Sequence, residues 1–215
     1  MKQAIKRVLL PGPGPRRLPL GIGRGVRMTI DFQHQTRTYL GLYEIELNKY
    51  LRRVLRPGVT AFDVGAQHGY DSLVIAKHTS APVAAFERDP QCAARLASSL
   101  ALNLALKDLV VPVNAMVGDE DGQLGLDEWA YASGGFVPDF VKLDIDGGEV
   151  GALRSAARIL QERHPALIVE VHSLALERDC ERILTSHGYA TTVVPQRKFF
   201  PDRRPIEHNR WLVAI

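Results

Sequence analysis

Residues 60–69 read TAFDVGAQHG, and this segment carries the most information about the fold of the chain. A short apolar run over residues 59–64 carries the carboxylate of Asp63 near its end and opens into a turn that contains Gly65 and Gly69. An amphipathic segment follows from Tyr70. This order predicts a strand, a tight loop and the start of a helix. The glycines let the backbone approach a ligand closely, and the helix start offers it unpaired N–H groups.

The polar groups of this turn suit a ligand that carries positive charge. Asp63 is expected at the carboxyl end of its strand, where open α/β sheets bind ligands. A carboxylate suits cationic groups better than a pyrophosphate, so S-adenosylmethionine, with its ammonium and sulfonium, fits. A dinucleotide is the alternative, but the pattern G-x-G-x-x-G is absent, and the glycines of residues 21–25 lack a strand–turn–helix context. A chance match, since many strand-to-helix turns carry glycine, is the third interpretation.

Strand-like and helix-like patterns alternate along the rest of the chain. Strands are predicted over residues 59–64, 82–87, 110–114, 139–144, 166–172, 189–194 and 209–215, and helices over residues 42–55, 69–79, 89–105, 147–162 and 175–187. A short strand is also expected from Met28 to Phe32. Strands separated by helices imply a mostly parallel sheet. The last two strands lack a helix between them, which favours an antiparallel final strand. The predicted fold class is α/β, a seven-stranded, Rossmann-like sheet similar to that of class I methyltransferases.

The N-terminal residues differ in composition from the rest. Residues 1–27 hold seven basic residues and no acid, and residues 11–25 are rich in proline and glycine. We therefore predict a basic, irregular arm over residues 1–27 and a catalytic domain over residues 28–215. The arm suggests nucleic acid or an anionic surface as a partner, with a plain solvated terminus as the alternative. Without a membrane span, a leader or paired cysteines, the chain is expected in the cytoplasm.

Polar side chains follow the second and third predicted strands as well. Glu87 ends the second strand, where an acidic side chain can accept the two ribose hydroxyls of an adenosine. Glu87 could also be an ordinary surface acid. After the third strand, Asn114 and Met116 are candidates to flank an adenine, one at its edge and one on its face.

The fourth and fifth strands carry charge at their carboxyl ends. Asp144 is expected in the same crevice as Asp63, and Lys142 is a possible ionic partner for it. Glu170 and His172 share one face of the fifth strand because they are two residues apart. His172 could take a proton from an acceptor, since the reference pKa of histidine is about 6.5; a structural histidine bonded to the backbone is the alternative.

Together these motifs resemble the FkbM family of S-adenosylmethionine-dependent methyltransferases. The resemblance covers roughly residues 39–215 and rests on the segments YLGLYE at 39–44, DVGA at 63–66 with Gly69, FE at 86–87, VGD at 117–119, KLDIDGGE at 142–149, Glu170 and NRW at 209–211. It differs from the family pattern at residues 67–68, 88 and 146–148. The resemblance implies Glu44 and Ala66 as further cofactor-binding residues. It also implies O-methylation of sugar or natural-product hydroxyls.

The expected activity is therefore methyl transfer from S-adenosylmethionine to a hydroxyl of a small molecule, sugar or glycan precursor. His172 and Asp144 are the candidate catalytic residues, with His68 in the glycine loop as the competing histidine. No metal is expected, because the chain has no Asp-Asn pair after the fifth strand. The alternatives are an RNA methyltransferase that uses the basic arm, and a non-catalytic protein that binds an adenosine cofactor.

Overall fold

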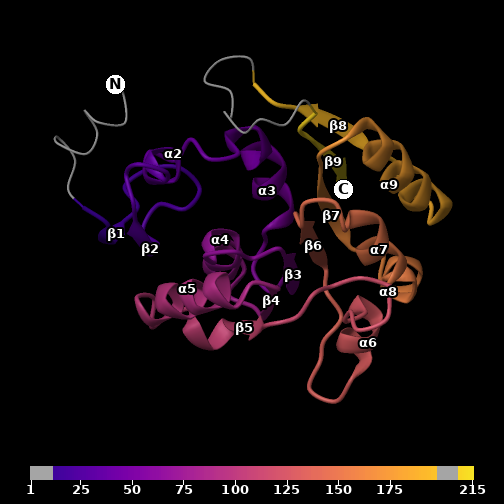
Figure 1. The fold of residues 1–215 in the computed structure, drawn as a ribbon, viewed down its shortest axis with the longest axis horizontal. Coiled ribbons are helices and arrows are strands. Elements are labelled where there is room, and N and C mark those ends of the chain that lie inside the picture. Colours follow the sequence, from indigo (N-terminus) through magenta and orange to yellow (C-terminus); the bar gives the residue numbers. More distant parts are fainter. Residues whose placement is uncertain (1–11, 198–207) are drawn as a thin grey trace.

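The computed structural model describes residues 12–197 and 208–215. Its centre is a seven-stranded sheet with the order β5-β4-β3-β6-β7-β9-β8 (Figure 1). The strands are β3 (Ala61–Val64), β4 (Val83–Phe86), β5 (Val110–Val113), β6 (Phe140–Leu143), β7 (Ala166–Val171), β8 (Thr192–Pro195) and β9 (Arg210–Ala214). Neighbours from β5 to β7 pair in parallel, whereas β9 is antiparallel to both β7 and β8. The predicted fold class is confirmed.

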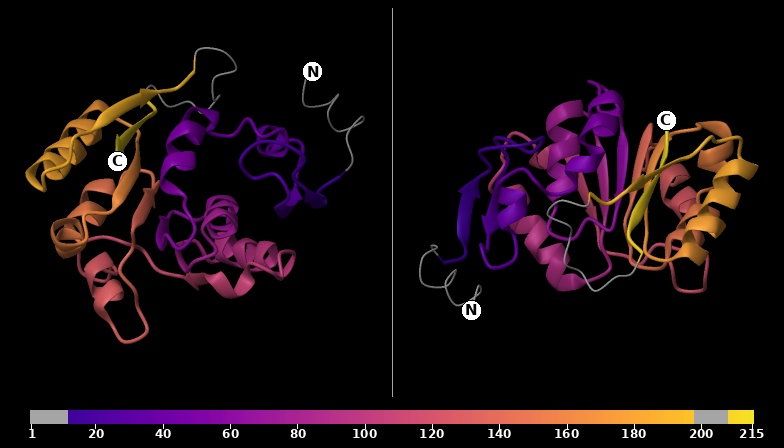
Figure 2. Two further views of the ribbon diagram at one scale, coloured as in Figure 1. Left: turned by 180° about the vertical axis from the view of Figure 1, so that it is seen from behind. Right: turned by 90° about the horizontal axis from the view of Figure 1, so that it is seen from above.

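Helices cover both faces of this sheet (Figure 2). On one face, α3 (Asn48–Val54), α4 (Tyr70–Thr79) and α5 (Pro90–Ala101) pack with one buried apolar cluster. On the other, α6 (Leu126–Tyr131), α7 (Glu149–Arg154), α8 (Ala157–Glu162) and α9 (Leu174–Ser186) pack with a second. Shorter elements are α2 (Thr36–Tyr39), η1 (Ile45–Leu47) and η2 (Lys107–Leu109). The helix expected over residues 147–162 is thus interrupted between α7 and α8, and that expected over 42–55 begins as η1.

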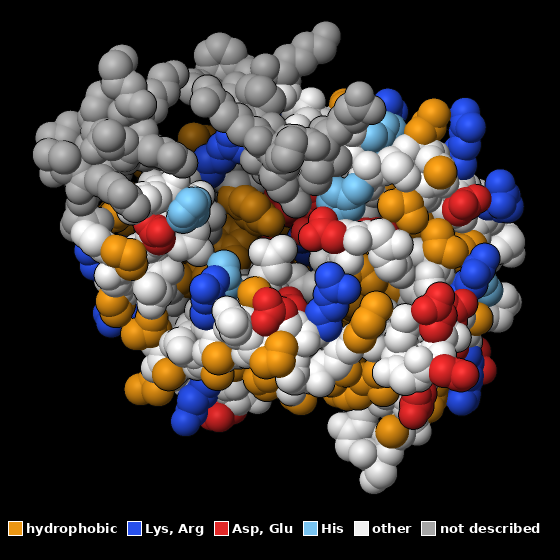
Figure 3. Space-filling model, in the orientation of Figure 1, with side chains coloured by type: hydrophobic (Ala, Val, Ile, Leu, Met, Phe, Trp, Pro, Cys, Tyr) orange, Lys and Arg blue, Asp and Glu red, His pale blue; other side chains and the backbone are white. Residues whose placement is uncertain are grey.

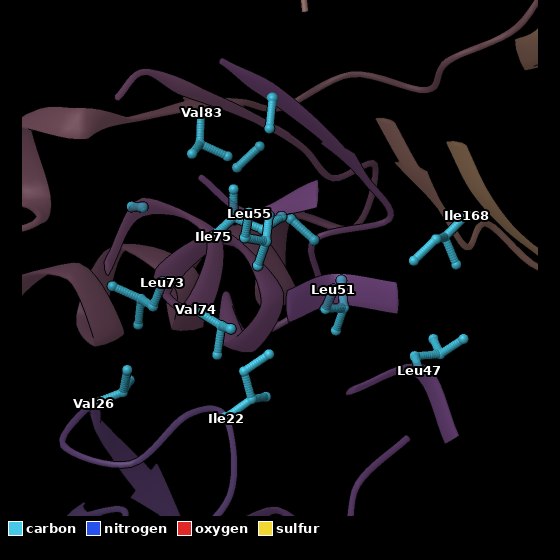
Figure 4. Close-up of a cluster of buried hydrophobic side chains, with 14 of the residues drawn as sticks. Ile22, Val26, Leu47, Leu51, Leu55, Leu73, Val74, Ile75, Val83 and Ile168 are labelled. Atoms are coloured by element: carbon cyan, nitrogen blue, oxygen red, sulfur yellow. The ribbon is translucent and has the colours of Figure 1, made fainter. Parts of the chain in front are cut away.

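Residues 14–30 form a packed hairpin, which corrects the expectation of an irregular arm for this part of the chain. Residues 1–11 of the expected arm lie outside the described residues. Strand β1 (Gly14–Arg17) pairs antiparallel with β2 (Arg27–Ile30), so the predicted boundary after residue 27 falls within a hairpin. Between these strands, Leu18, Ile22 and Val26 are buried in the first cluster. Ile22 and Val26 lie beside Leu73 and Val74 of α4 (Figure 4). The high proline and glycine content of residues 11–25 indicates a loop, although Leu18, Ile22 and Val26 recur every four residues. Whether residues 1–27 act as a separate functional unit stays a prediction.

Because the hairpin belongs to the core, truncating it should cost stability. Leu18 is 1% exposed and Leu20 is 53% exposed. We expect Leu18→Ala to lower the free energy of unfolding by about 2–5 kcal/mol, the usual cost of emptying a buried leucine site. The matched variant Leu20→Ala should change it by less than about 0.5 kcal/mol. Urea unfolding of the two variants measures the difference, and equal stabilities would show that the hairpin does not contribute to the fold.

Candidate active site

A cavity of about 670 Å³ opens at the carboxyl ends of β3, β4, β5 and β6. Pockets for small molecules and cofactors usually have volumes of about 300–1,000 Å³. Four of the predicted site residues line this cavity: Gly65, Glu87, Met116 and Asp144. Glu44, Asp63, Ala66, Gly69, Asn114 and His172 do not. In the space-filling view the molecule is hollowed near its centre, with hydrophobic side chains on the floor and acidic side chains at the rim (Figure 3).

The loop from β3 to α4 brings its backbone against the end of β6. Gly65 has a φ of 97°, and a Cβ on it would lie 1.8 Å from the carbonyl oxygen of Asp144. The N–H groups of Gly65 and Ala66 both donate to the carbonyl of Phe86 at 2.9 Å, which ties the loop to β4. Gly69 caps α4 with a φ of 82°. Only glycine fits position 65, so the cavity wall here is bare backbone.

Glu87 is held at the end of β4 by main-chain donors. Its carboxylate accepts hydrogen bonds from the N–H of Gln67 at 2.8 Å and of Asp89 at 2.7 Å. Each carboxylate oxygen has a second lone pair, so Glu87 can still accept from a ligand hydroxyl. The Asn114 amide donates to the carbonyl of Glu87 at 2.7 Å and so positions the strand end, whereas Met116 is 45% exposed on the cavity wall.

A buried ionic cluster lies beside the cavity, centred on Lys142. The Lys142 Nζ lies 3.1 Å from the Asp71 carboxylate, 3.3 Å from that of Glu44 and 3.6 Å from that of Asp144. Asp63 stands next to Lys142 in the register of β3 and β6, and it accepts a hydrogen bond from the Ser72 hydroxyl. Three carboxylates therefore share one ammonium group, with that of Asp63 close by, in a place where the Lys142 side chain is only 3% exposed.

Burial of these carboxylates shifts their proton affinity. Burial raises the pKa of Glu44 and of Asp63 to about 7, and it holds the pKa of Asp144 well above its usual range. Burial alone would lower the pKa of Lys142, but the carboxylates of Asp71 and Glu44 outweigh it and raise that pKa. The cluster therefore has too little positive charge for its acids. Such a site attracts a further cation.

This imbalance predicts how cation binding depends on pH. Below pH 7, Asp63 and Glu44 hold protons in the ligand-free protein, and a bound cation favours their ionised forms. Binding must release protons, so the affinity for S-adenosylmethionine should fall as pH falls through 7, by up to about tenfold per pH unit for each proton released. Calorimetry at about pH 6, 7 and 8 measures this. Adenosine, which carries neither the ammonium nor the sulfonium, should bind with the same affinity at all three pH values. An equal pH dependence for both ligands would show that the carboxylates are not responsible.

His172 lies among carboxylates at the end of β7. Its Nε2 is 3.4 Å from Asp146 and 3.5 Å from Glu170, and its Nδ1 is 3.5 Å from Glu149. Glu149 and Glu170 raise the pKa of His172 to about 10, so the ring is a cation at neutral pH in this state. The expectation that it is poised as a base near neutral pH does not hold for the ligand-free protein, and its catalytic role stays a prediction.

Asp144, Glu170 and His172 each present a potential metal-ligand atom, all within 4.8 Å of one another. The register explains this, because Lys142 pairs with Ile168 and therefore places Asp144 level with Glu170. The positively charged His172 ring neutralises part of this group without a metal. That the reaction needs no metal stays a prediction.

The competing histidine has a different environment. The His68 Nε2 lies 2.9 Å from the Arg95 guanidinium and its Nδ1 3.5 Å from the Gln35 amide. Burial and the Arg95 charge lower the pKa of His68, so its ring is neutral at physiological pH. Its nitrogens face these two side chains, and His68 does not line the cavity.

Two features of the site escaped the sequence analysis. Asp71 is in the first turn of α4, where an acid usually serves the helix dipole in solvent; here it turns back to Lys142. The loop of residues 145–148 with Val150 and Gly151 forms one wall of the cavity. The sequence signal for this loop is the pair Gly147-Gly148, which indicates a turn but not that the turn lines a cavity. Asp146 in the same loop is 64% exposed.

Part of the chain matches a known protein family. Residues 123–194 match the methyltransferase FkbM domain, which confirms the resemblance drawn from the motifs. A search of curated proteins finds no match.

Solved structures share the fold. A methyltransferase FkbM from Methylobacillus flagellatus KT is 19% identical with a TM-score of 0.60, covering 86% of this chain and 54% of its own. A precorrin-6y C5,15-methyltransferase from Geobacter metallireducens GS-15 is 20% identical with a TM-score of 0.57, covering 80% and 87%. Fibrillarin from Aeropyrum pernix, with natively bound S-adenosyl-L-methionine, is 14% identical with a TM-score of 0.54, covering 75% and 68%.

Proposed function

We propose that this chain is an S-adenosylmethionine-dependent methyltransferase of the FkbM family that methylates a hydroxyl group of a small molecule, sugar or glycan precursor in the cytoplasm. The observation that carries the proposal is the ionic cluster around Lys142, in which carboxylates outnumber cations beside a cavity of nucleoside size. Among the described residues no helix is long and apolar enough to cross a membrane.

The residues present fit the cofactor. Gly65 lines the cavity with backbone alone, and Glu87, beside the same loop, can accept the ribose hydroxyls. Met116 offers an apolar surface to the adenine. Asp63, Glu44 and Asp144 provide negative charge for the ammonium and sulfonium. When bound, S-adenosylmethionine supplies the methyl group and the positively charged sulfur from which it leaves.

The acceptor side of the reaction needs a group that removes a proton. Transfer to an oxygen requires alignment of acceptor and methyl, and the hydroxyl has to lose its proton. His172 stands beside Asp144 and Glu170 at the edge of this region. Its pKa of about 10 in the ligand-free protein falls when a positive charge binds nearby, because like charges disfavour the imidazolium. In our proposal His172 loses its proton on cofactor binding and then accepts that of the hydroxyl.

Removing this imidazole should therefore slow the reaction without weakening cofactor binding. We expect His172→Ala to lower turnover by about two to four orders of magnitude, with the affinity for S-adenosylmethionine changed only a few-fold. His68→Ala is the matched control, because His68 is also near the glycine loop but is held by Arg95. A fully active His172→Ala protein with an inactive His68→Ala protein would assign the role to the other histidine.

The class of acceptor is tested by following a labelled methyl group. Purified protein is incubated with methyl-labelled S-adenosylmethionine and, separately, with sugars and nucleotide sugars, with small hydroxylated natural products, and with tRNA and rRNA. Each reaction is repeated after a chelator has removed divalent metal ions. The rate of methyl transfer should not change, because we expect the reaction to need no metal. Label on a hydroxyl of a small molecule supports the proposal. Label only on RNA would favour the RNA methyltransferase, and cofactor binding with no transfer to any class would favour a non-catalytic role.

A further inference from the structure

A second, basic groove lies at the other end of the molecule. It has a volume of about 470 Å³ and runs between the β1–β2 hairpin and the chain that follows α5. Four basic side chains line it, those of Arg17, Arg24, Arg27 and Lys77. No acidic residue is among its lining residues in the described part of the chain. The hairpin and α5 lie side by side at one end of the molecule (Figures 1 and 2).

The groove is held in shape by specific contacts. Asn103 accepts a hydrogen bond from the N–H of Arg27 at 3.0 Å and donates to its carbonyl at 2.6 Å, which fixes β2 to the end of α5. A Cβ on Gly25 would lie 3.8 Å from both the Arg17 Nη2 and the Lys77 Cε, so these two side chains converge over the glycine. Within residues 12–197 and 208–215, none of the four basic side chains forms an ion pair.

An exposed aliphatic side chain stands among these cations. Leu104 lines the groove and is 70% exposed, the largest exposed fraction among the big hydrophobic side chains of the described residues. No aromatic side chain lines the groove. Proteins that hold single-stranded nucleic acid combine cations with aromatic platforms for the bases. Cations combined with an exposed leucine instead suit a bilayer surface, where the charges meet anionic headgroups and the leucine enters the acyl boundary.

We propose that this groove docks the protein on an anionic lipid surface. Docking here would leave the active site accessible. Helix α4 begins at the glycine loop of the cavity, and Lys77 is in its last turn, so the groove lies at the opposite edge of the sheet from the cavity. The inference is independent of the acceptor, because none of the groove residues contributes to the cavity.

The test is flotation of the full-length protein with vesicles. Vesicles of phosphatidylcholine containing about 30% phosphatidylglycerol should bind it at about 0.1 M salt, and pure phosphatidylcholine should not. The double variant Arg24→Gln/Arg27→Gln should weaken partitioning by about fivefold per arginine removed, and Leu104→Ser should weaken it further.

The controls remove equal charge and equal apolar surface elsewhere. Arg52→Gln/Arg53→Gln changes two exposed arginines of α3, and Leu174→Ser changes a leucine that is 46% exposed at the start of α9. Both controls should bind vesicles like the wild-type protein. The proposal is overturned if the wild-type protein does not bind anionic vesicles, if groove and control variants lose binding equally, or if single-stranded RNA binds through the groove arginines while vesicles do not.

Discussion

Replacing Lys142 by methionine is expected to destabilise the protein by about 3–5 kcal/mol, the usual cost of leaving buried charges without their partner. The Lys142 ammonium is the cation shared by the carboxylates of Glu44, Asp71 and Asp144, at 3.1–3.6 Å. Methionine keeps much of the side-chain volume, so the loss in the free energy of unfolding reflects the missing charge and not a cavity. Glu44, which precedes η1, and Asp71 of α4 would then lose their shared cation.

The matched control is Lys77→Met, which removes an exposed lysine from the last turn of α4. It should change the free energy of unfolding by less than about 0.5 kcal/mol. The cost of Lys142→Met should also shrink as pH falls, because protonation of the carboxylates removes the charge that needs a partner. Urea unfolding at about pH 8 and about pH 5.5 measures both effects. A Lys142→Met protein as stable as Lys77→Met would show that the cluster does not depend on the lysine.

Gly65→Ala should weaken the binding of S-adenosylmethionine by about a hundredfold, which corresponds to a loss of about 2.8 kcal/mol in binding free energy. The added Cβ would lie 1.8 Å from the Asp144 carbonyl oxygen, so β3 and β6 would have to separate where both line the cavity. Alanine is also strained at the φ of 97° that Gly65 adopts.

Gly58→Ala is the control that distinguishes backbone strain from the displacement of neighbouring backbone. Gly58 has a φ of 88°, and a Cβ on it would meet nothing within 4 Å. Both variants therefore carry backbone strain, but only Gly65→Ala has a backbone collision. Calorimetry with S-adenosylmethionine should show near-normal binding to Gly58→Ala. Normal binding to Gly65→Ala, in a protein that remains folded, would mean that the close approach of the two loops is not needed for the cofactor.

The central sheet could be predicted because its strands are short apolar runs punctuated by glycine and proline. Strand β2 overlaps the strand predicted from Met28 to Phe32. Its partner β1 could not be predicted, since Gly14 and Pro15 indicate a loop and only the spacing of Leu18, Ile22 and Val26 points to a buried face. Helix α6 was also missed. It is six residues long, too short for a periodic pattern to be distinguished from a loop.

For the site, the sequence indicated which strand ends carry polar groups but not how those groups interact. The position of Asp63, Glu87 and Asp144 after successive strands follows from the parallel order. The return of Asp71 to Lys142, and the ring of carboxylates around His172, depend on distances between elements. The pKa of His172 lies at about 10, above its reference value, because Glu149 from another element joins Glu170 beside the ring.

A crystal structure of the protein with S-adenosylhomocysteine would show where the cofactor binds. We expect the adenosine in the cavity between the β3–α4 loop and Met116, with the ribose hydroxyls on the Glu87 carboxylate. The homocysteine should lie beside the Lys142 cluster, with its sulfur directed toward Asp144. Adenosine bound outside this cavity, or a homocysteine ammonium that contacts none of Asp63, Glu44 and Asp144, would contradict this expectation.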